Sequence, residues 1–253
     1  MMALAAMSFS LPPSAFASES PVDLTLYARL LDAHTRPSDD IVAVRVDYQT
    51  IGAAEGWNDL VSQVGSARPS LLDRDAQIAF WINAYNILTI DLVVKHYPLE
   101  SIKDIGSFFS PVWDIEVATI EGRPISLGEI EHEILRPMGE PRIHAAIVCA
   151  STSCPPLART PFRPDRLEED LSAAMRAWLG SDQKGIRIDR GARRVTISKI
   201  FDWFEEDFEA GGGVLTTISK YLDAPDASWL RSERSSVSVS YFRYDWSLND
   251  LQR

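Results

Sequence analysis

Both cysteines of the chain and one of its four histidines fall within residues 142–157, RIHAAIVCASTSCPPL. We predict that this stretch opens as a strand, because apolar side chains alternate between two faces over residues 143–150. Only His144 interrupts the apolar character, so the strand is expected to be buried on both faces. A small-residue loop, 151–153, then leads to Cys154. A thiol in a loop at the end of a central strand is a common position for a nucleophile.

Cys154 is therefore the candidate nucleophile. Pro155 disfavours helical geometry at Cys154 and is itself suited to the first position of a helix, so Cys154 is expected to cap a short turn. The N–H groups of residues 151–155 would then stabilise a thiolate and form an oxyanion hole. His144 is the candidate base, with Glu131 or Asn83 orienting its imidazole. The predicted reaction is acyl transfer or hydrolysis at an amide, on a peptide or a γ-glutamyl thiol compound.

Other interpretations of the same residues stay open. Cys149 and Cys154 could form a structural disulfide in an oxidising compartment. They could also act as a thiol–disulfide partner, although their five-residue step is unlike Cys-x-x-Cys. A third alternative is a binding domain without catalysis, in which Cys154 and the asparagines hold a peptide or a small thiol. His144 could equally be a satisfied core histidine.

The strongest predicted helix covers residues 73–96. Asp73 or Asp75 can cap its start, and its last turn is basic. It is apolar nearly all round, which is typical of a buried helix. Asn83 and Asn86 project from these apolar sides and need hydrogen-bond partners, either a neighbouring backbone or a ligand.

A second helix is expected to begin at a capping box, Ser126 with Glu129, and to run to about Met138. On it, Glu131 projects into an apolar arc and His132 lies at the edge. A buried carboxylate must find a cation or several donors, or its pKa must rise. Glu131 is thus a candidate catalytic residue, with a core salt bridge as the alternative.

The remaining pattern predicts a single α+β domain over residues 18–253, with a mostly antiparallel sheet packed on the buried 73–96 helix. The suggested analogy is a papain- or transglutaminase-like core. The residue order counts against it, because the cysteine precedes the histidine in those enzymes and His144 precedes Cys154 here. Along the chain we expect a helix at 24–33, a strand at 41–48, a helix within 50–64, a hairpin of 113–120 with 123–125, a helix from 164 to 179, a hairpin of 186–189 with 195–197, helices at 199–208 and 214–222, and a strand at 237–244.

Composition narrows the class of partner. The chain has 253 residues and a net charge of −11, which argues against nucleic acid or an anionic membrane surface. The histidines and cysteines lack a usual zinc spacing, and there is no phosphate-binding glycine loop. We therefore expect no metal and no cofactor, and a small molecule or peptide as substrate.

The first seventeen residues carry no charged side chain and end in Ala15-Phe16-Ala17. An apolar run with such an ending predicts a secretory signal peptide, 1–17, although the usual positive start is missing. We expect no later run to span a membrane, because none approaches the ~20 apolar residues that a span needs. We expect an exported protein, periplasmic where the source is Gram-negative.

Several motifs together resemble the family catalogued as domain of unknown function 547. They follow one another along the chain: Val46-Asp47-Tyr48, Phe80-Trp81-Ile82-Asn83-Ala84-Tyr85-Asn86, Ile130-Glu131-His132, Leu135-Arg136, Arg142-Ile143-His144, Cys149-Ala150-Ser151, Cys154-Pro155-Pro156-Leu157, residues 198–204, Asp207-Phe208 and residues 244–249. The resemblance implies no settled activity. Some similar eukaryotic proteins carry a glutaredoxin module on the same chain, which suggests thiol or glutathione-linked chemistry. It also suggests a characteristic set of residues: Asn83, Asn86, Glu131, His132, His144, Cys149, Ser151 and Cys154.

Overall fold

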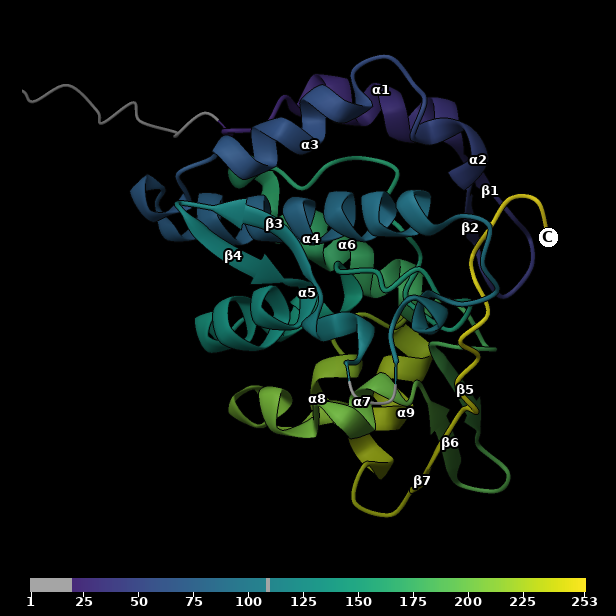
Figure 1. The fold of residues 1–253 in the computed structure, drawn as a ribbon. Coiled ribbons are helices and arrows are strands. Elements are labelled where there is room, and N and C mark those ends of the chain that lie inside the picture. Colours follow the sequence, from purple (N-terminus) through teal and green to yellow (C-terminus); the bar gives the residue numbers. More distant parts are fainter. Residues whose placement is uncertain (1–19, 108–109) are drawn as a thin grey trace, which may run out of the picture.

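The structure is a computed structural model that describes residues 20–107 and 110–253. The expected signal peptide, 1–17, lies outside the described residues. The described chain combines many helices with small sheets, which confirms the predicted α+β class. Figure 1 shows helices from the first half of the chain above, and the three-stranded sheet with the shorter helices below.

Helix α4 (Arg74–His96) runs through the upper part, beneath α1 (Leu24–His34), α2 (Tyr48–Ile51) and α3 (Trp57–Ser66) (Figure 1). The Asp73 carboxylate accepts a hydrogen bond from the N–H of Ala76 at 2.9 Å, and so caps the helix as predicted. Nearly every residue from Ala76 to Val93 is buried, which explains the lack of a polar stripe. By length and composition α4 could cross a membrane, but 89% of the qualifying window is buried inside the fold.

The predicted hairpin forms from β3 (Glu116–Ile120) and β4 (Arg123–Ser126), in antiparallel register. The capping box that follows is present, because Ser126 and Glu129 each accept the other's backbone N–H. The helical run then passes from α5 (Leu127–Glu129) through a π-helical turn, Ile130–Leu135, to a 3₁₀ turn, Arg136–Met138. It ends where the sequence predicted. Single π-helical turns are frequent at functional sites, and this one holds Glu131 and His132.

The lower part contains the second predicted hairpin, β5 (Ile186–Asp189) with β6 (Arg194–Ile197). Strand β7 (Ser238–Tyr241) joins β6 in parallel. Short helical elements cover this sheet: α7 (Ile200–Trp203), a 3₁₀ run (Glu205–Gly211), α8 (Val214–Ile218) and α9 (Ala224–Glu233). Helix α6 (Leu167–Leu179) lies behind α4 in Figure 1 and contributes to the cores of both parts.

The strand expected at 143–150 is wrong. A 3₁₀ helix, Pro141–Ala145, occupies its start, and the chain then runs without regular structure to Cys149. Pro141 sits in the first turn, where its missing N–H costs nothing, and the Glu140 side chain accepts from the N–H of Arg142. The apolar pattern did not distinguish a strand from a helical turn, because this stretch is buried on all sides and nearly all of its residues are apolar.

The strands form three small sheets rather than one larger sheet. Two are antiparallel pairs, β1 (Thr35–Pro37) with β2 (Val44–Val46) and β3 with β4, and the third is the mixed sheet β5-β6-β7. The strand expected at 41–48 is therefore shorter than predicted, and residues 35–37 were not expected to pair. The chain end returns to the upper part, where Asp250 forms a bridge with Val46 and Leu248 one with Ser151.

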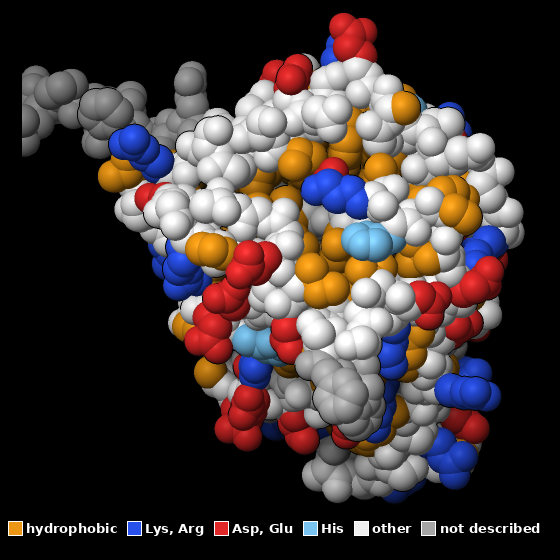
Figure 2. All heavy atoms as spheres, in the orientation of Figure 1, with side chains coloured by type: hydrophobic (Ala, Val, Ile, Leu, Met, Phe, Trp, Pro, Cys, Tyr) orange, Lys and Arg blue, Asp and Glu red, His pale blue; other side chains and the backbone are white. Residues whose placement is uncertain are grey.

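The buried apolar residues fall into two clusters. The larger surrounds α4, and the smaller lies between α6 and the β5-β6-β7 sheet. Figure 2 shows hydrophobic side chains near the middle of one face and acidic side chains down its left side. The acidic groups agree with the net charge of −11.

Candidate functional site

A cavity of about 150 Å³ lies where the two buried clusters meet. Its wall comes from α4, the π-helical turn, the 3₁₀ segment before Cys149, α7 and the C-terminal segment. The wall combines ionisable groups, both cysteines and many aromatic rings: Tyr85, Trp113, Glu131, His132, His144, Ile147, Cys149, Cys154, Ile200, Trp203, Phe204, Tyr244 and Trp246. Five of the eight predicted site residues are among them.

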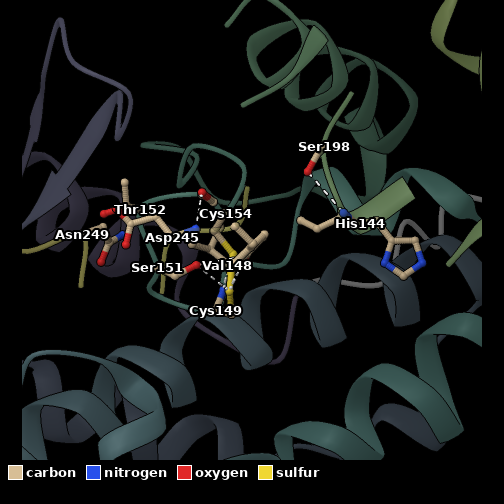
Figure 3. Close-up of a disulfide and its surroundings, with 12 residues drawn as sticks. His144, Val148, Cys149, Ser151, Thr152, Cys154, Ser198, Asp245 and Asn249 are labelled. Atoms are coloured by element: carbon tan, nitrogen blue, oxygen red, sulfur yellow. Dashed lines mark hydrogen bonds between the residues drawn. A yellow bond between two sulfur atoms is a disulfide. The ribbon is translucent and has the colours of Figure 1, made fainter. Parts of the chain in front are cut away.

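Cys149 and Cys154 are joined by a disulfide, with their Cα atoms 6.3 Å apart (Figure 3). The structure thus holds the bridged state, one of the two alternatives that the sequence left open. The loop folds back on itself at Ala150, which adopts a positive φ of 59°. Cys154 is only 3% exposed, whereas Cys149 is half-buried. Of the two sulfur-bearing residues, Cys149 is the more accessible.

The Cys149 sulfur lies among hydroxyl groups. Ser151 Oγ is 3.2 Å from it and Tyr244 Oη is 3.3 Å from it, and the two oxygens are 3.0 Å apart. Burial raises the pKa of the Tyr244 hydroxyl well above its ordinary value, so this group keeps its proton. The Cys154 sulfur accepts a hydrogen bond from the N–H of Cys149 at 3.0 Å. Each sulfur therefore has a donor within reach if the bridge opens.

The predicted oxyanion hole is wrong, because carbonyl groups already take three N–H groups of the loop. Thr152 donates to Ser247 at 2.7 Å, Ser153 to Asp245 at 3.2 Å, and Cys154 to Ser151 at 3.1 Å. The expected helical turn after Cys154 is also absent, since residues 155–158 adopt no regular structure. The C-terminal segment takes two of these donors and the loop itself takes the third, so none of the three is free to bind an oxyanion.

His144 does not pair with a cysteine in the structure. Its Nε2 donates to Oδ2 of Asp207 at 2.7 Å, because an ionised carboxylate can only accept. Its Nδ1 lies 3.8 Å from Oε1 of Glu131, too far for a hydrogen bond. Phe204 stacks on the imidazole with ring centroids 4.1 Å apart. Figure 3 shows this ring well to one side of the two sulfur atoms.

Asp207 is the centre of a charge network. Arg136 donates to it through Nε at 2.7 Å and through Nη2 at 2.9 Å. Burial opposes ionisation of Asp207, but the hydrogen bonds from His144 and Arg136 outweigh it and hold the pKa of the carboxyl well below its usual range. Burial lowers the pKa of His144, so the ring is neutral near pH 7. Asp207, and neither Glu131 nor Asn83, orients the imidazole.

Glu131 borders the cavity with little support for its charge. Its nearest donor is the Tyr85 hydroxyl, at 3.5 Å from Oε2, and its side chain is 15% exposed. Burial raises the pKa of the Glu131 carboxyl to about 7, against the lowering effects of Arg136 and Tyr85. The core salt bridge offered as the alternative does not form. Glu131 is instead a carboxyl group that changes its charge near neutral pH.

Asn83 and Asn86 bond backbone groups, as one of the two interpretations expected. Asn83 donates to the carbonyl of Phe162 at 2.8 Å and accepts from its N–H at 3.0 Å. Asn86 donates to the carbonyl of Ala146 at 2.9 Å and accepts from the N–H of Val148 at 2.8 Å. Neither lines the cavity. Each amide holds an irregular segment against α4, and Asn86 thereby fixes the approach to Cys149.

The other predicted residues take lesser places. His132 is exposed at the cavity edge, 3.3 Å from Arg136, and burial and then the charge of Arg136 lower its pKa. Ser151 is buried and reaches the Cys149 sulfur. Asp207 and the aromatic wall did not appear among the predicted site residues. The motifs around 203 and 244 contained them, but nothing in their spacing linked them to His144 or Cys149.

Comparison with known families gives one match. Residues 69–179 match the family model described as "Protein of unknown function, DUF547". This segment belongs to the DUF547 family. The resemblance predicted from the motifs is confirmed over these residues, while the motifs at 46–48, 198–208 and 244–249 lie outside the match. The DUF547 segment supplies both cysteines, His144 and Glu131, and the rest of the chain supplies Asp207 and much of the aromatic wall. No curated protein and no solved structure matches the chain significantly.

Proposed function

We propose that the protein exchanges its Cys149–Cys154 disulfide with small thiol compounds that enter the aromatic cavity. The observation that carries this proposal is that both cysteines line one cavity, with the Cys149 sulfur touching two hydroxyl groups. Hydrogen-bond donors stabilise a thiolate, lower its pKa and make it a better leaving group. Disulfides that serve structure alone have no need of such donors.

Exchange would proceed in two balanced steps. A substrate thiolate bonds to the Cys149 sulfur while the Cys149–Cys154 bond breaks, and Cys154 leaves as a thiolate that the N–H of Cys149 stabilises. A second substrate thiolate then attacks the substrate sulfur of this mixed disulfide. The substrate disulfide departs, and Cys149 leaves as a thiolate beside Ser151 and Tyr244. Two substrate thiols are oxidised and one protein disulfide is reduced.

Acyl transfer by Cys154, predicted from the sequence, has less support. It needs a free thiolate next to a base, and here Cys154 is bridged and 3% exposed. The imidazole of His144 is engaged by Asp207. A papain- or transglutaminase-like core with a sheet on its central helix also stays a proposal. Helix α4 is buried as such a helix would be, but it carries Asn83 where those enzymes carry cysteine.

We also propose that the protein is exported. A disulfide between the two cysteines fits an oxidising compartment, and the apolar start of the sequence fits a signal peptide. In the periplasm, substrate thiols and disulfides would both be accessible to the cavity.

Matched cysteine variants test the proposal. We expect Cys154→Ser, incubated with 2-hydroxyethyl disulfide, to accumulate a mixed disulfide at Cys149, detected by intact mass and peptide mapping. Cys149→Ser should react at least about tenfold more slowly, because the remaining Cys154 thiol is buried. Limited iodoacetamide labelling of the reduced wild type gives the same order without a substitution, with Cys149 modified first.

Two results would contradict the proposal. One is equal or faster reaction at Cys154 in both the variants and the wild type. The other is a wild-type disulfide that millimolar small thiols leave intact in the folded protein, which would make it a structural crosslink. Circular dichroism of both variants shows that the comparison is between folded proteins.

A further inference from the structure

Four aromatic side chains of the cavity wall pack close to one another. Tyr244 and Trp246 have ring centroids 4.5 Å apart, Trp203 lies 4.8 Å from Tyr244, and Trp113 lies 6.2 Å from Trp246. All four line the cavity. Trp203 is 42% exposed, a large apolar surface to leave in water. We call these four residues the aromatic box.

Among the described residues, the cavity wall has one carboxyl group, that of Glu131, and no lysine or arginine. Arg136 lies behind, and its charge is offset by Asp207 and by Glu206, which accepts from Nη2 at 2.5 Å. Carboxyl groups of Asp114 and Glu133 lie within electrostatic range of His132 at the edge. When Glu131 is ionised, the described wall therefore carries a negative charge that a positive ligand would offset.

One contact already shows a cation on this box. The Lys103 ammonium lies over the Trp246 ring, 4.9 Å from its centroid, and Lys103 does not line the cavity. The face of Trp246 thus already holds an ammonium group of the protein itself. Cations bind the faces of tryptophan and tyrosine through the ring quadrupole, and several such rings around one space form the usual receptor for ammonium groups.

We propose that the cavity selects compounds with an ammonium group, which binds among the aromatic box and pairs with the Glu131 carboxylate. Taken with the proposed function, on which the substrate assignment rests, the preferred substrate is an aminothiol or its disulfide. The ammonium group lies in the box and its sulfur reaches Cys149, which lines the same cavity. Burial raises the pKa of Glu131 to about 7, and a bound cation would lower it again, so binding strengthens as pH rises through 7.

Binding is tested first without any sulfur chemistry. Tryptophan fluorescence of the oxidised protein is titrated with tetramethylammonium chloride, with neutral tert-butanol as the matched probe and sodium chloride as the salt control. We expect saturable quenching by the cation, at least about tenfold tighter than any response to the alcohol. Trp203→Leu and Glu131→Gln should each weaken the cation response several-fold, whereas Glu55→Gln, at an exposed position away from the cavity wall, should not. Equal responses to the two probes would overturn the proposal.

Exchange rates then separate the substrate assignment from the proposed function. The reduced protein is mixed with cystamine, 2-hydroxyethyl disulfide or dithiodiglycolate, and each rate is divided by that of free dithiothreitol with the same disulfide. The expected order is cation, neutral, anion, with about tenfold between the first two. Reaction at equal normalised rates contradicts the cation preference and leaves the exchange function standing. No reaction with any of them removes the exchange function, while the fluorescence titration still decides whether the box binds cations.

Discussion

Replacing Glu131 with glutamine should change how stability depends on pH. The ordinary glutamate pKa is 4.5, and burial raises that of Glu131 to about 7 in the folded protein. The folded state therefore holds its proton more tightly than the unfolded state. Between these two values the native state binds more protons, so the free energy of unfolding falls as pH rises from about 4.5 to about 7. Above pH 7, the folded protein bears the full free-energy cost of keeping the Glu131 carboxylate ionised.

The magnitude follows from the two pKa values. Their difference, at 1.36 kcal/mol for each pKa unit, gives about 3 kcal/mol lost by the wild type across this window. Glu131→Gln keeps the shape and cannot ionise, so it escapes this loss. Relative to the wild type, the variant should gain about 3 kcal/mol between pH 4 and pH 8, whatever its stability at pH 4.

Urea unfolding followed by fluorescence measures this difference at each pH, because urea leaves charge interactions unscreened. Glu133→Gln is the matched control, since Glu133 is exposed on the same turn. A Glu131→Gln curve that runs parallel to the wild type from pH 4 to pH 8 would refute the reasoning. It would mean that Glu131 ionises freely in the folded protein.

Three further predictions follow from the contacts around the cavity. Tyr244→Phe removes a hydroxyl at 3.3 Å from the Cys149 sulfur, so the apparent pKa of the reduced Cys149 thiol should rise by roughly one unit when iodoacetamide labelling is followed against pH. Tyr241→Phe, at an exposed tyrosine, is the control. An unchanged Cys149 pKa in Tyr244→Phe would show that this hydroxyl does not stabilise the thiolate. Asp207→Asn leaves Arg136 and His144 without their shared carboxylate and should lower the free energy of unfolding by about 3 kcal/mol at pH 7, measured in urea. The difference should shrink as pH falls below about 4, because a carboxyl with a depressed pKa contributes stability only above its unfolded pKa. A difference that does not depend on pH would contradict the ion pair. Asn86→Ala leaves an N–H and a carbonyl of the 146–148 segment unpaired and should lower the free energy of unfolding by about 3 kcal/mol. Asn58→Ala, on the exposed face of α3, should change it by no more than about 0.5 kcal/mol. Similar changes for both variants would show that the Asn86 hydrogen bonds do not stabilise the fold.

Local signals explain the elements that sequence reasoning found. Asp73 at the start of α4, and the reciprocal pairing of Ser126 with Glu129, are contacts within a few residues. The hairpins β3-β4 and β5-β6 are also local, since each closes over a short turn. Such features depend on neighbours in the chain, so the sequence displays them directly.

The errors arose where distant segments decide the structure. Residues 146–148 look like a buried strand, but the Ala146 carbonyl and the Val148 N–H bond Asn86, sixty or more positions earlier. His144 meets Asp207 across 63 positions, and Cys149 meets Tyr244 across 95. No periodicity encodes such contacts, so the chemistry-bearing residue types could be named while their partners could not. The choice of Cys154 over Cys149 failed to anticipate burial for the same reason.

The equilibrium reduction of the Cys149–Cys154 disulfide against defined ratios of reduced and oxidised glutathione tests the central proposal most directly. Alkylation of the quenched samples and intact mass give the reduced fraction at each ratio. The disulfide borders a cavity, and each sulfur has a hydrogen-bond donor nearby that would stabilise its thiolate. We therefore predict a reduction potential above roughly −300 mV, in the range of exchangeable disulfides. A bridge that stays oxidised across all ratios in the folded protein, with a potential below that value, would contradict the account.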